Sequence, residues 1–250
     1  MESGWKSIPR QESFVEAPVP NPFENNMRKL TRKEKLYVLL ATVTLVPIRA
    51  FFMTVFLLLT WPVAFVATYG LQDSLGKVPL TGWRRELRGP LRRFLKAMLW
   101  ASGIPIRTKR IIGKRAHPSV APILVAAPHA SLWDGCAACL GCGLPSFVAA
   151  RFNKDLPILG RLIEFLQPVY VTREDPQSRQ NTIKEIIRRT HSGGEWPQIV
   201  IFPEGTTTNG RALITFKPGA FIPAVPVQPV LIRYPNKIDT GGFLFCVCGT

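Results

Sequence analysis

A histidine and an aspartate lie five residues apart in the stretch PHASLWDG, residues 128–135. An imidazole titrates near neutral pH, so His129 is suited to accept a proton from an attacking hydroxyl group. A carboxylate on the other ring nitrogen would fix the tautomer and stabilise the cation that forms. On a continuous helix a five-residue step separates two side chains by about 140°, so only a turn brings Asp134 to His129. Pro128 and Gly135 favour such a turn. The pair is therefore a candidate catalytic dyad, and a histidine that caps a helix start is the alternative.

A second polar stretch follows a buried run, in IFPEGTTTNG at residues 201–210. The apolar run ends at Phe202 and continues through Glu204 and Gly205 into hydroxyl and amide side chains that begin at Thr206. A glycine lets the backbone approach a ligand closely, and free N–H groups in such a loop suit an anion or an oxyanion. The stretch is a candidate binding loop, and an ordinary polar turn is the alternative.

Two basic residues lie in stretches that are otherwise mostly apolar. Arg173 ends the run PVYVTR, and Lys217 stands in FKPGAF, where Gly219 permits close approach of the backbone. A guanidinium or an ammonium group can hold a phosphate in such a place. Both residues are candidate phosphate-binding cations, and a solvated surface charge is the alternative for each.

The cysteines follow neither a metal-binding nor a disulfide pattern. The chain has five, and an odd count leaves at least one unpaired. Cys136, Cys139 and Cys142 recur every three residues, but a structural zinc needs four ligands and no second cluster of matching spacing follows. We therefore expect no metal site, a reducing, cytosol-facing domain, and small helix or core roles for these three cysteines.

Beyond about residue 100, short β-rich runs alternate with helical stretches, a pattern typical of a layered α/β domain. Five runs predict strands, at residues 122–128, 146–151, 168–173, 198–205 and 227–234. The clearest helix follows Asp175, has Pro176 at its first position and ends before Gly193. His129 therefore directly follows one predicted strand, and Glu204 lies at the end of another.

A long apolar run at residues 36–70 precedes this domain. It does not begin the chain and ends in no small-residue cleavage site, so it predicts a membrane anchor rather than a secretory signal. Pro47 and Arg49 interrupt it, and basic residues flank both of its sides. We favour a helical hairpin that dips into one leaflet, with a single span over residues 50–69 as the alternative. Residues 1–35 are expected to be disordered, and residues 71–110 to form a basic amphipathic connector.

The charge and composition of the chain indicate which classes of partner it could bind. The formal net charge is +16, while 46% of the residues are hydrophobic. That combination suits an anionic membrane surface or a phosphate-bearing substrate. Nucleic acid is not expected as a partner, because the basic residues cluster beside the apolar run and no known nucleic-acid-binding module occurs.

The order of these stretches resembles a known family. An H-x4-D box, an arginine-ended strand, an F-P-E-G box and a proline-rich strand, behind a membrane anchor, are similar to the four blocks of the glycerophospholipid acyltransferases. The stretches VPNPF, PLTGWRR, SGGEWPQIVIFPEGT, ITFKPGAFIP and PVQPVLIRYPNKIDT resemble the lysophosphatidylcholine acyltransferase branch, including members that acetylate lyso-platelet-activating factor. The similarity extends over about residues 18–240.

The resemblance implies a layered α/β, glycerolipid-acyltransferase-like domain over residues 111–240, behind an N-terminal helical membrane anchor. His129 would be the general base on the lysophospholipid hydroxyl, with Asp134 as its orienting partner. The candidates for substrate binding are Arg173, Glu204, Gly205, Thr206 and Lys217. Acyl-CoA would be a co-substrate that is attacked directly, so neither a cofactor nor a covalent nucleophile is needed. The sequence agrees, because it contains no G-x-S-x-G stretch.

The same resemblance implies partners and a location. These are a lysophospholipid, acyl-CoA and membrane lipids, at the endoplasmic reticulum membrane with a cytosolic catalytic domain; the Golgi and lipid droplets are alternatives. Thr207 stands where phosphatidic-acid-forming relatives usually carry arginine, which disfavours lysophosphatidic acid as the acceptor. Residues 241–250 depart from the branch, so we expect a C-terminally truncated product. The alternative function is a catalytically inactive, membrane-anchored fragment that binds lipid or a full-length partner.

Overall fold

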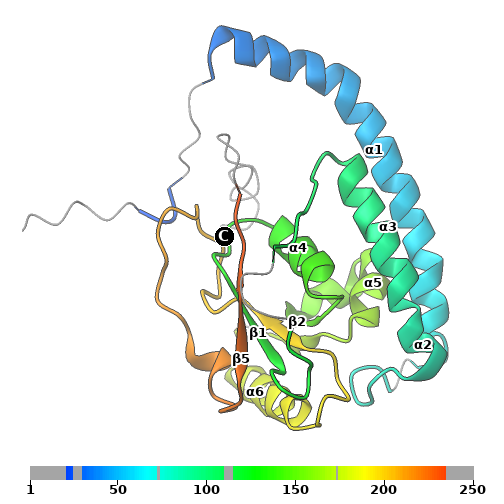
Figure 1. The fold of residues 1–250 in the computed structure, drawn as a ribbon, viewed down its shortest axis with the longest axis vertical. Coiled ribbons are helices and arrows are strands. Elements are labelled where there is room, and N and C mark those ends of the chain that lie inside the picture. Colours follow the sequence, from blue (N-terminus) through cyan, green and yellow to red (C-terminus); the bar gives the residue numbers. More distant parts are fainter. Residues whose placement is uncertain (1–20, 25–29, 72–73, 110–114, 173, 235–250) are drawn as a thin grey trace, which may run out of the picture.

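The centre of the protein is a parallel β-sheet of five strands (Figure 1). The computed structural model describes residues 21–24, 30–71, 74–109, 115–172 and 174–234, and the structural statements below concern these residues. The strands lie in the order β3-β2-β4-β1-β5. Their bounds are β1 (Ile123–Ala127), β2 (Ser146–Ala150), β3 (Val169–Val171), β4 (Ile199–Ile201) and β5 (Val227–Leu231). All five lie within the predicted runs, so the layered α/β fold is confirmed.

The two central strands are apolar on both faces because helices cover both sides of the sheet. Ile123 of β1 pairs with Ile199 of β4, and both side chains are buried. Along β1, alternate side chains point to opposite faces, so Ile123 and Leu124 enter different core layers. One layer includes Ile186 of α6 (Pro176–Thr190), and the other includes Ala138 of α4 (Trp133–Gly141). A strand buried on both faces reads as a continuous apolar run, which explains why these strands could be predicted.

Helix α6 begins as its sequence predicts. The carboxylate of Asp175 accepts a hydrogen bond from the backbone N–H of Gln177 at 2.9 Å, and Pro176 occupies the first turn, where its missing N–H costs nothing. The helix ends at Thr190, shortly before Gly193. The remaining helices are α2 (Gly82–Glu86), α3 (Arg88–Ala101), α5 (Leu159–Phe165), and the short 3₁₀ helices η1 (Arg151–Asp155) and η2 (Pro218–Ala220).

The apolar run forms one continuous helix, α1 (Arg32–Thr68), which lies along the outside of the molecule with α3 beside it (Figure 1). Thr31 and Glu34 close its start as a capping box. Pro47 and Pro62 lie inside the helix without ending it. A proline removes only its own N–H from the ladder, and the long apolar stretch on either side keeps the helix going. The structure therefore corrects the preferred hairpin: residues 30–71 do not turn back.

The C-terminal part of α1 packs against the domain rather than standing free. Thr60, Ala64, Ala67 and Thr68 are buried, while large apolar side chains along the first two thirds of the helix are exposed. Within the described residues, α1 is the one helix whose length and composition would allow it to cross a membrane. The alternative prediction, a single membrane span over residues 50–69, also needs revision, because the last turns of that span pack against the rest of the protein.

A buried arginine ties the segment after α1 to the sheet domain. Arg189 of α6 is almost fully buried, and its Nη2 donates to the carbonyl oxygen of Gly76 at 3.1 Å. Gln167 completes the attachment, because its side chain accepts from Leu80 N at 3.1 Å and donates to Val78 O at 2.9 Å. These bonds satisfy backbone groups of the connector and hold it against the domain.

Candidate active site

The candidate residues meet at the carboxyl edge of the sheet. His129 follows β1, Glu204 follows β4, and Tyr234 follows β5. Since β4, β1 and β5 are parallel neighbours, their carboxyl ends lie side by side, where the loops of such sheets form binding sites. Helix α4 begins at the same edge and brings Asp134 in its first turn.

The predicted turn between His129 and Asp134 is present. Nδ1 of His129 lies 2.8 Å from Oδ2 of Asp134. His129 stands in the loop after β1, while Asp134 lies within α4, so the two side chains do not share a continuous helix. The spacing that would separate them on a helix therefore brings them together here. The helix-capping alternative is wrong, because no described side chain caps the start of α4 and the His129 ring contacts Asp134 instead.

The carboxylate of Asp134 is fully buried and surrounded by donors. Besides the imidazole, Oδ2 accepts the backbone N–H groups of Ala130 at 2.7 Å and Ser131 at 2.8 Å. The hydroxyl of Tyr234 donates to the other oxygen, Oδ1. A buried carboxylate needs several such bonds to stay ionised, and bonds to a charged acceptor are the strong ones. Asp134 is therefore held rigidly as an acceptor for the imidazole.

The orientation of the His129 ring leaves one nitrogen for chemistry. Nδ1 faces the carboxylate and so carries the proton of the neutral ring, which leaves the lone pair on Nε2. Nε2 makes no hydrogen bond to any residue that the structure describes, and the side chain is 22% exposed. The ring stacks on Phe202, with 4.1 Å between ring centroids. His129 is therefore a positioned proton acceptor that solvent or a substrate can reach.

Glu204 holds the backbone around His129. Its side chain is only 1% exposed, and Oε1 accepts the backbone N–H of His129 at 2.9 Å. Oε2 accepts the hydroxyl of Thr208 at 3.4 Å, and the N–H of Thr208 donates to the carbonyl oxygen of His129 at 2.8 Å. The two loops are thus bonded together through Glu204 and Thr208. This geometry favours a positioning role for Glu204.

The other candidates in this loop are more exposed. Gly205 has a φ of +67°, and a Cβ placed on it would lie 2.8 Å from Nζ of Lys217. Lys217 therefore lies against the loop while its side chain is open to solvent, as is Thr206. Arg173 lies outside the described residues. The structure thus brings Lys217 and Gly205 together, and their binding roles stay predictions.

A short N-terminal segment lies on the same loop. Nδ2 of Asn209 donates to the carbonyl oxygen of Asn21 at 2.8 Å, and its backbone N–H donates to the carbonyl oxygen of Pro22 at 2.8 Å. The expected disorder of residues 1–35 is therefore wrong for residues 21–24 and for residues 30–35, which begin α1. Specific backbone bonds hold residues 21–24 in place despite their polar, proline-rich composition; residues 1–20 and 25–29 lie outside the described part.

Two neighbouring groups are kept neutral. Burial raises the pKa of the Cys136 thiol to about 11, and the nearby Asp134 carboxylate adds to the effect. Burial, and then its hydrogen bond to Asp134, also raise the pKa of Tyr234 well above its usual range. Cys136 is therefore a thiol rather than a thiolate nucleophile, and Tyr234 a hydrogen-bond donor at neutral pH. Cys139 and Cys142 are buried in the apolar core, as predicted.

Among the described residues no group of three or more histidine, cysteine or acidic side chains could hold a metal ion. The site contains an imidazole, that of His129, hydrogen-bonded to a buried carboxylate. Beside it is a loop in which Gly205 has a positive φ and lies against the ammonium group of Lys217. This arrangement can remove a proton from a hydroxyl group that attacks a carbonyl carbon.

The sequence shows the family to which this fold belongs. The sequence matches the family model described as Acyltransferase over residues 109–233, and the chain belongs to this family. It is 50% identical to human lysophosphatidylcholine acyltransferase 2 over 93% of its length, and 46% identical to zebrafish (Danio rerio) lysophosphatidylcholine acyltransferase 1 over 92%. The chain spans 42% and 43% of these two relatives.

A solved structure shares the fold. The 1-acyl-sn-glycerophosphate (LPA) acyltransferase PlsC from Thermotoga maritima aligns with a TM-score of 0.53, over 74% of this chain and 69% of that chain. Only 17% of the residues are identical, so this likeness concerns the fold.

The sequence reasoning missed three residues of the site. Tyr234 and Thr208 lie far from the H-x4-D box in sequence, and Phe202 reads as the end of an apolar run. Their positions after parallel strands were the only available hint, because such positions meet at the carboxyl edge.

Proposed function

We propose that this chain is a membrane-bound O-acyltransferase that moves an acyl group from acyl-CoA to a lysophospholipid, lysophosphatidylcholine or lyso-platelet-activating factor. The observation that carries the proposal is the 2.8 Å contact between Nδ1 of His129 and the buried Asp134 carboxylate, which leaves Nε2 as a proton acceptor. The names of the relatives support the acceptor class.

The reaction needs no covalent enzyme intermediate. The free hydroxyl oxygen of the lysophospholipid attacks the thioester carbonyl carbon of acyl-CoA, and Nε2 of His129 takes its proton. Asp134 stabilises the imidazolium that forms. When the tetrahedral intermediate collapses, the carbon–sulfur bond breaks and His129 returns the proton to the leaving thiolate. The products are a phospholipid and free CoA, and no cofactor takes part.

The loop after β4 is proposed to face the negatively charged parts of the substrates. The exposed Lys217 lies against Gly205, next to backbone that Glu204 bonds to His129. An ammonium group here attracts a phosphate, and it can also stabilise the developing oxyanion. Thr206 is exposed in the same loop and Arg173 ends the run that forms β3, so we propose both as substrate contacts.

The apolar helix supports a membrane location. Most of α1 exposes large apolar side chains, and basic residues flank it on both sides. We propose that α1 anchors the chain in the endoplasmic reticulum membrane with the catalytic domain on the cytosolic side. Fractionation of cells expressing the tagged chain, with protease protection of both ends, tests this placement. Release by carbonate washing would contradict it.

The activity is tested with membranes that contain the 250-residue chain, a panel of lysophospholipids and labelled acyl-CoA. His129→Ala should abolish acyl transfer at equal protein level. His191→Ala is the matched control, because His191 lies exposed at the end of α6. Acyl transfer that persists in His129→Ala would refute the mechanism. A membrane-bound chain without turnover would favour the inactive fragment.

A further inference from the structure

A cleft of about 380 Å³ lies at the end of the sheet opposite His129. Its walls come from segments that directly precede strands: Arg115 and His117 precede β1, Gly143 precedes β2, and Gln198 precedes β4. The amino ends of parallel strands meet at one edge of a sheet, so this cleft is separate from the candidate active site. The far wall comes from α2 and the start of α3.

The cleft carries an excess of positive charge. Arg85, Arg88 and Arg115 line it, and Glu195 is the one acidic residue among its lining residues. The exposed Arg85 makes no ion pair with any described residue. Arg88 donates from Nη1 to the carbonyl oxygen of Leu144 at 2.8 Å, while its buried Nε has no partner. An anion in the cleft would offset this charge.

The repulsion between the guanidinium groups of Arg85 and Arg88 also favours an anion in the cleft. Burial, followed by the charge of Arg85, lowers the pKa of Arg88 to about 10. Arg88 therefore remains a cation at neutral pH, but it is held beside another cation without a counter-ion among the residues described. Such an arrangement costs free energy that a bound anion would return.

The opposite wall is rigid. Nε and Nη2 of Arg115 both donate to Oε1 of Gln198, at 2.8 and 2.5 Å, and Gln198 donates in turn to the carbonyl oxygen of Ala121 at 2.7 Å. The guanidinium lies against Gly143, where any Cβ would collide with Nη1. These contacts fix the guanidinium of Arg115 in the wall of the cleft, where its charge adds to the charges of Arg85 and Arg88.

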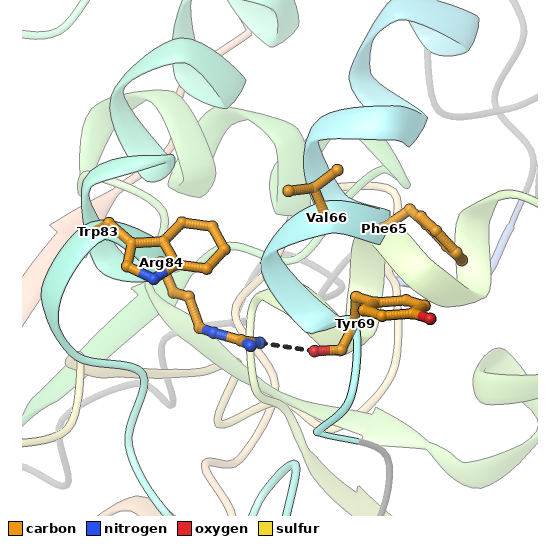
Figure 2. A pocket seen from close by; sticks show the side chains of 5 residues that line it. All are labelled: Phe65, Val66, Tyr69, Trp83 and Arg84. Carbon is orange, nitrogen blue, oxygen red and sulfur yellow. Dashed lines mark hydrogen bonds between the residues drawn. The ribbon is translucent and has the colours of Figure 1, made fainter.

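An apolar groove of about 340 Å³ lies where α2 meets the end of α1 (Figure 2). Phe65, Val66 and Tyr69 of the α1 end form it together with Trp83 and Arg84. Nη1 of Arg84 donates to the carbonyl oxygen of Tyr69 at 2.9 Å, the dashed line in Figure 2. Arg84 and Arg85 are consecutive residues, so α2 presents one arginine to an apolar groove and the next to a basic cleft.

We propose that the cleft lined by Arg85, Arg88 and Arg115 is a binding site for a phosphate ester, separate from the acyl-transfer site. The phosphate can come from a lipid headgroup, whose acyl chains would lie in the neighbouring groove, or from a soluble phosphate ester. The groove, exposed beside the end of the apolar helix, favours the lipid source.

The experiment is a titration of the full chain, purified in a neutral maltoside detergent, by isothermal calorimetry. The probes are glycerol 3-phosphate, dioctanoyl phosphatidic acid and, as a phosphate-free control, dioctanoylglycerol. Arg85→Gln should weaken binding of the phosphate probes about tenfold, the loss expected for one charged hydrogen bond. Arg93→Gln removes the same charge from an exposed position of α3 that does not line the cleft, and it should leave binding unchanged.

The titrations are repeated in the His129→Ala background, so that failure of the proposed function would not affect the result. Phosphatidic acid binding much tighter than glycerol 3-phosphate identifies a lipid headgroup, and equal affinities identify a soluble ester; either supports the site. Equal weakening by Arg85→Gln and Arg93→Gln, in chains with unchanged unfolding temperatures, would overturn it. Absence of phosphate-dependent binding would do the same.

Discussion

The hydroxyl of Tyr234 donates to Oδ1 of Asp134, across 100 residues of sequence. This bond joins the segment after β5 to the first turn of α4, and it occupies the carboxylate oxygen that the imidazole leaves open. The Asp134 carboxylate therefore contacts the proposed base, which follows β1, and is itself held by Tyr234, which follows β5. Tyr234 is a positioning residue, because it acts on His129 only through Asp134.

Tyr234→Phe should lower kcat for acyl transfer about tenfold and leave KM nearly unchanged, because it removes one hydrogen bond to a charged group and keeps the ring. Initial rates over a range of lysophospholipid concentrations measure the two constants. Tyr170→Phe is the matched control, since the buried hydroxyl of Tyr170 has no partner in the described structure. Equal loss in the two variants would contradict the positioning role.

Asp134→Asn should lower kcat by about a hundredfold or more, because a neutral amide keeps an oxygen for Nδ1 and the two backbone N–H groups but cannot stabilise the imidazolium cation. The amide is the same size, so the chain should remain folded. Acyl transfer and the unfolding temperature are measured on the same preparation. Activity within tenfold of the unchanged chain would show that this carboxylate is not part of the mechanism.

Glu204→Ala should destabilise the chain by about 1–3 kcal/mol, because it leaves the backbone N–H of His129 without its acceptor in a buried place. Glu204→Gln should retain much of the stability, since an amide oxygen can still accept that bond. Unfolding in detergent with increasing urea measures the difference. Glu86→Ala, on the exposed side of α2, serves as the control. An unfolding midpoint for Glu204→Ala equal to that of the control would contradict this role.

Gly205→Ala should destabilise the loop by about 1–2 kcal/mol, because φ is +67° and an added Cβ would press on the Lys217 side chain. Gly141→Ala is the contrasting variant. Gly141 lies in α4, and a Cβ there would make only an ordinary contact at 3.7 Å with Oγ1 of Thr108, so alanine should stabilise the chain by up to about 1 kcal/mol. Thermal unfolding compares the two variants. Unfolding temperatures that shift in the same direction would contradict the strained turn at Gly205.

The ion pairs at the end of α6 should make stability fall in acid. Burial by itself would raise the pKa of Glu185, but hydrogen bonds from Arg188 and Arg189 outweigh it and lower the pKa overall. A carboxyl with a lowered pKa stabilises the folded state above its unfolded pKa, and this contribution is lost as the pH falls through the folded value. The free energy of unfolding of the unchanged chain should therefore approach that of Glu185→Gln between pH 7 and pH 3. A constant difference would refute this linkage.

Local sequence was enough for the strands and for the dyad. A strand buried on both faces requires a continuous apolar run, as in Ile123–Ala127, and the start of α6 needs only Asp175 and Pro176. His129 and Asp134 are separated by a single turn, so the residues between them decide whether they meet. The family resemblance added the roles of these residues.

Contacts between distant segments required the tertiary structure. Glu204 reads in sequence as a residue of a polar loop, yet burial turns its carboxylate inward to the backbone of His129. Arg189 reads as a surface charge on a helix, yet it is buried and bonded to the connector after α1. The hairpin prediction failed similarly, because prolines within a helix do not by themselves say whether the chain turns back.

The sequence by itself determined the strands, the capped helix and the His129–Asp134 turn, because each depends on residues within a few positions of one another. Only the tertiary structure decided that Tyr234 and Glu204 support that pair, and that three arginines converge at the opposite edge of the sheet. The physical reason is that parallel strands bring their loops together in the order of the sheet, which differs from the order of the chain.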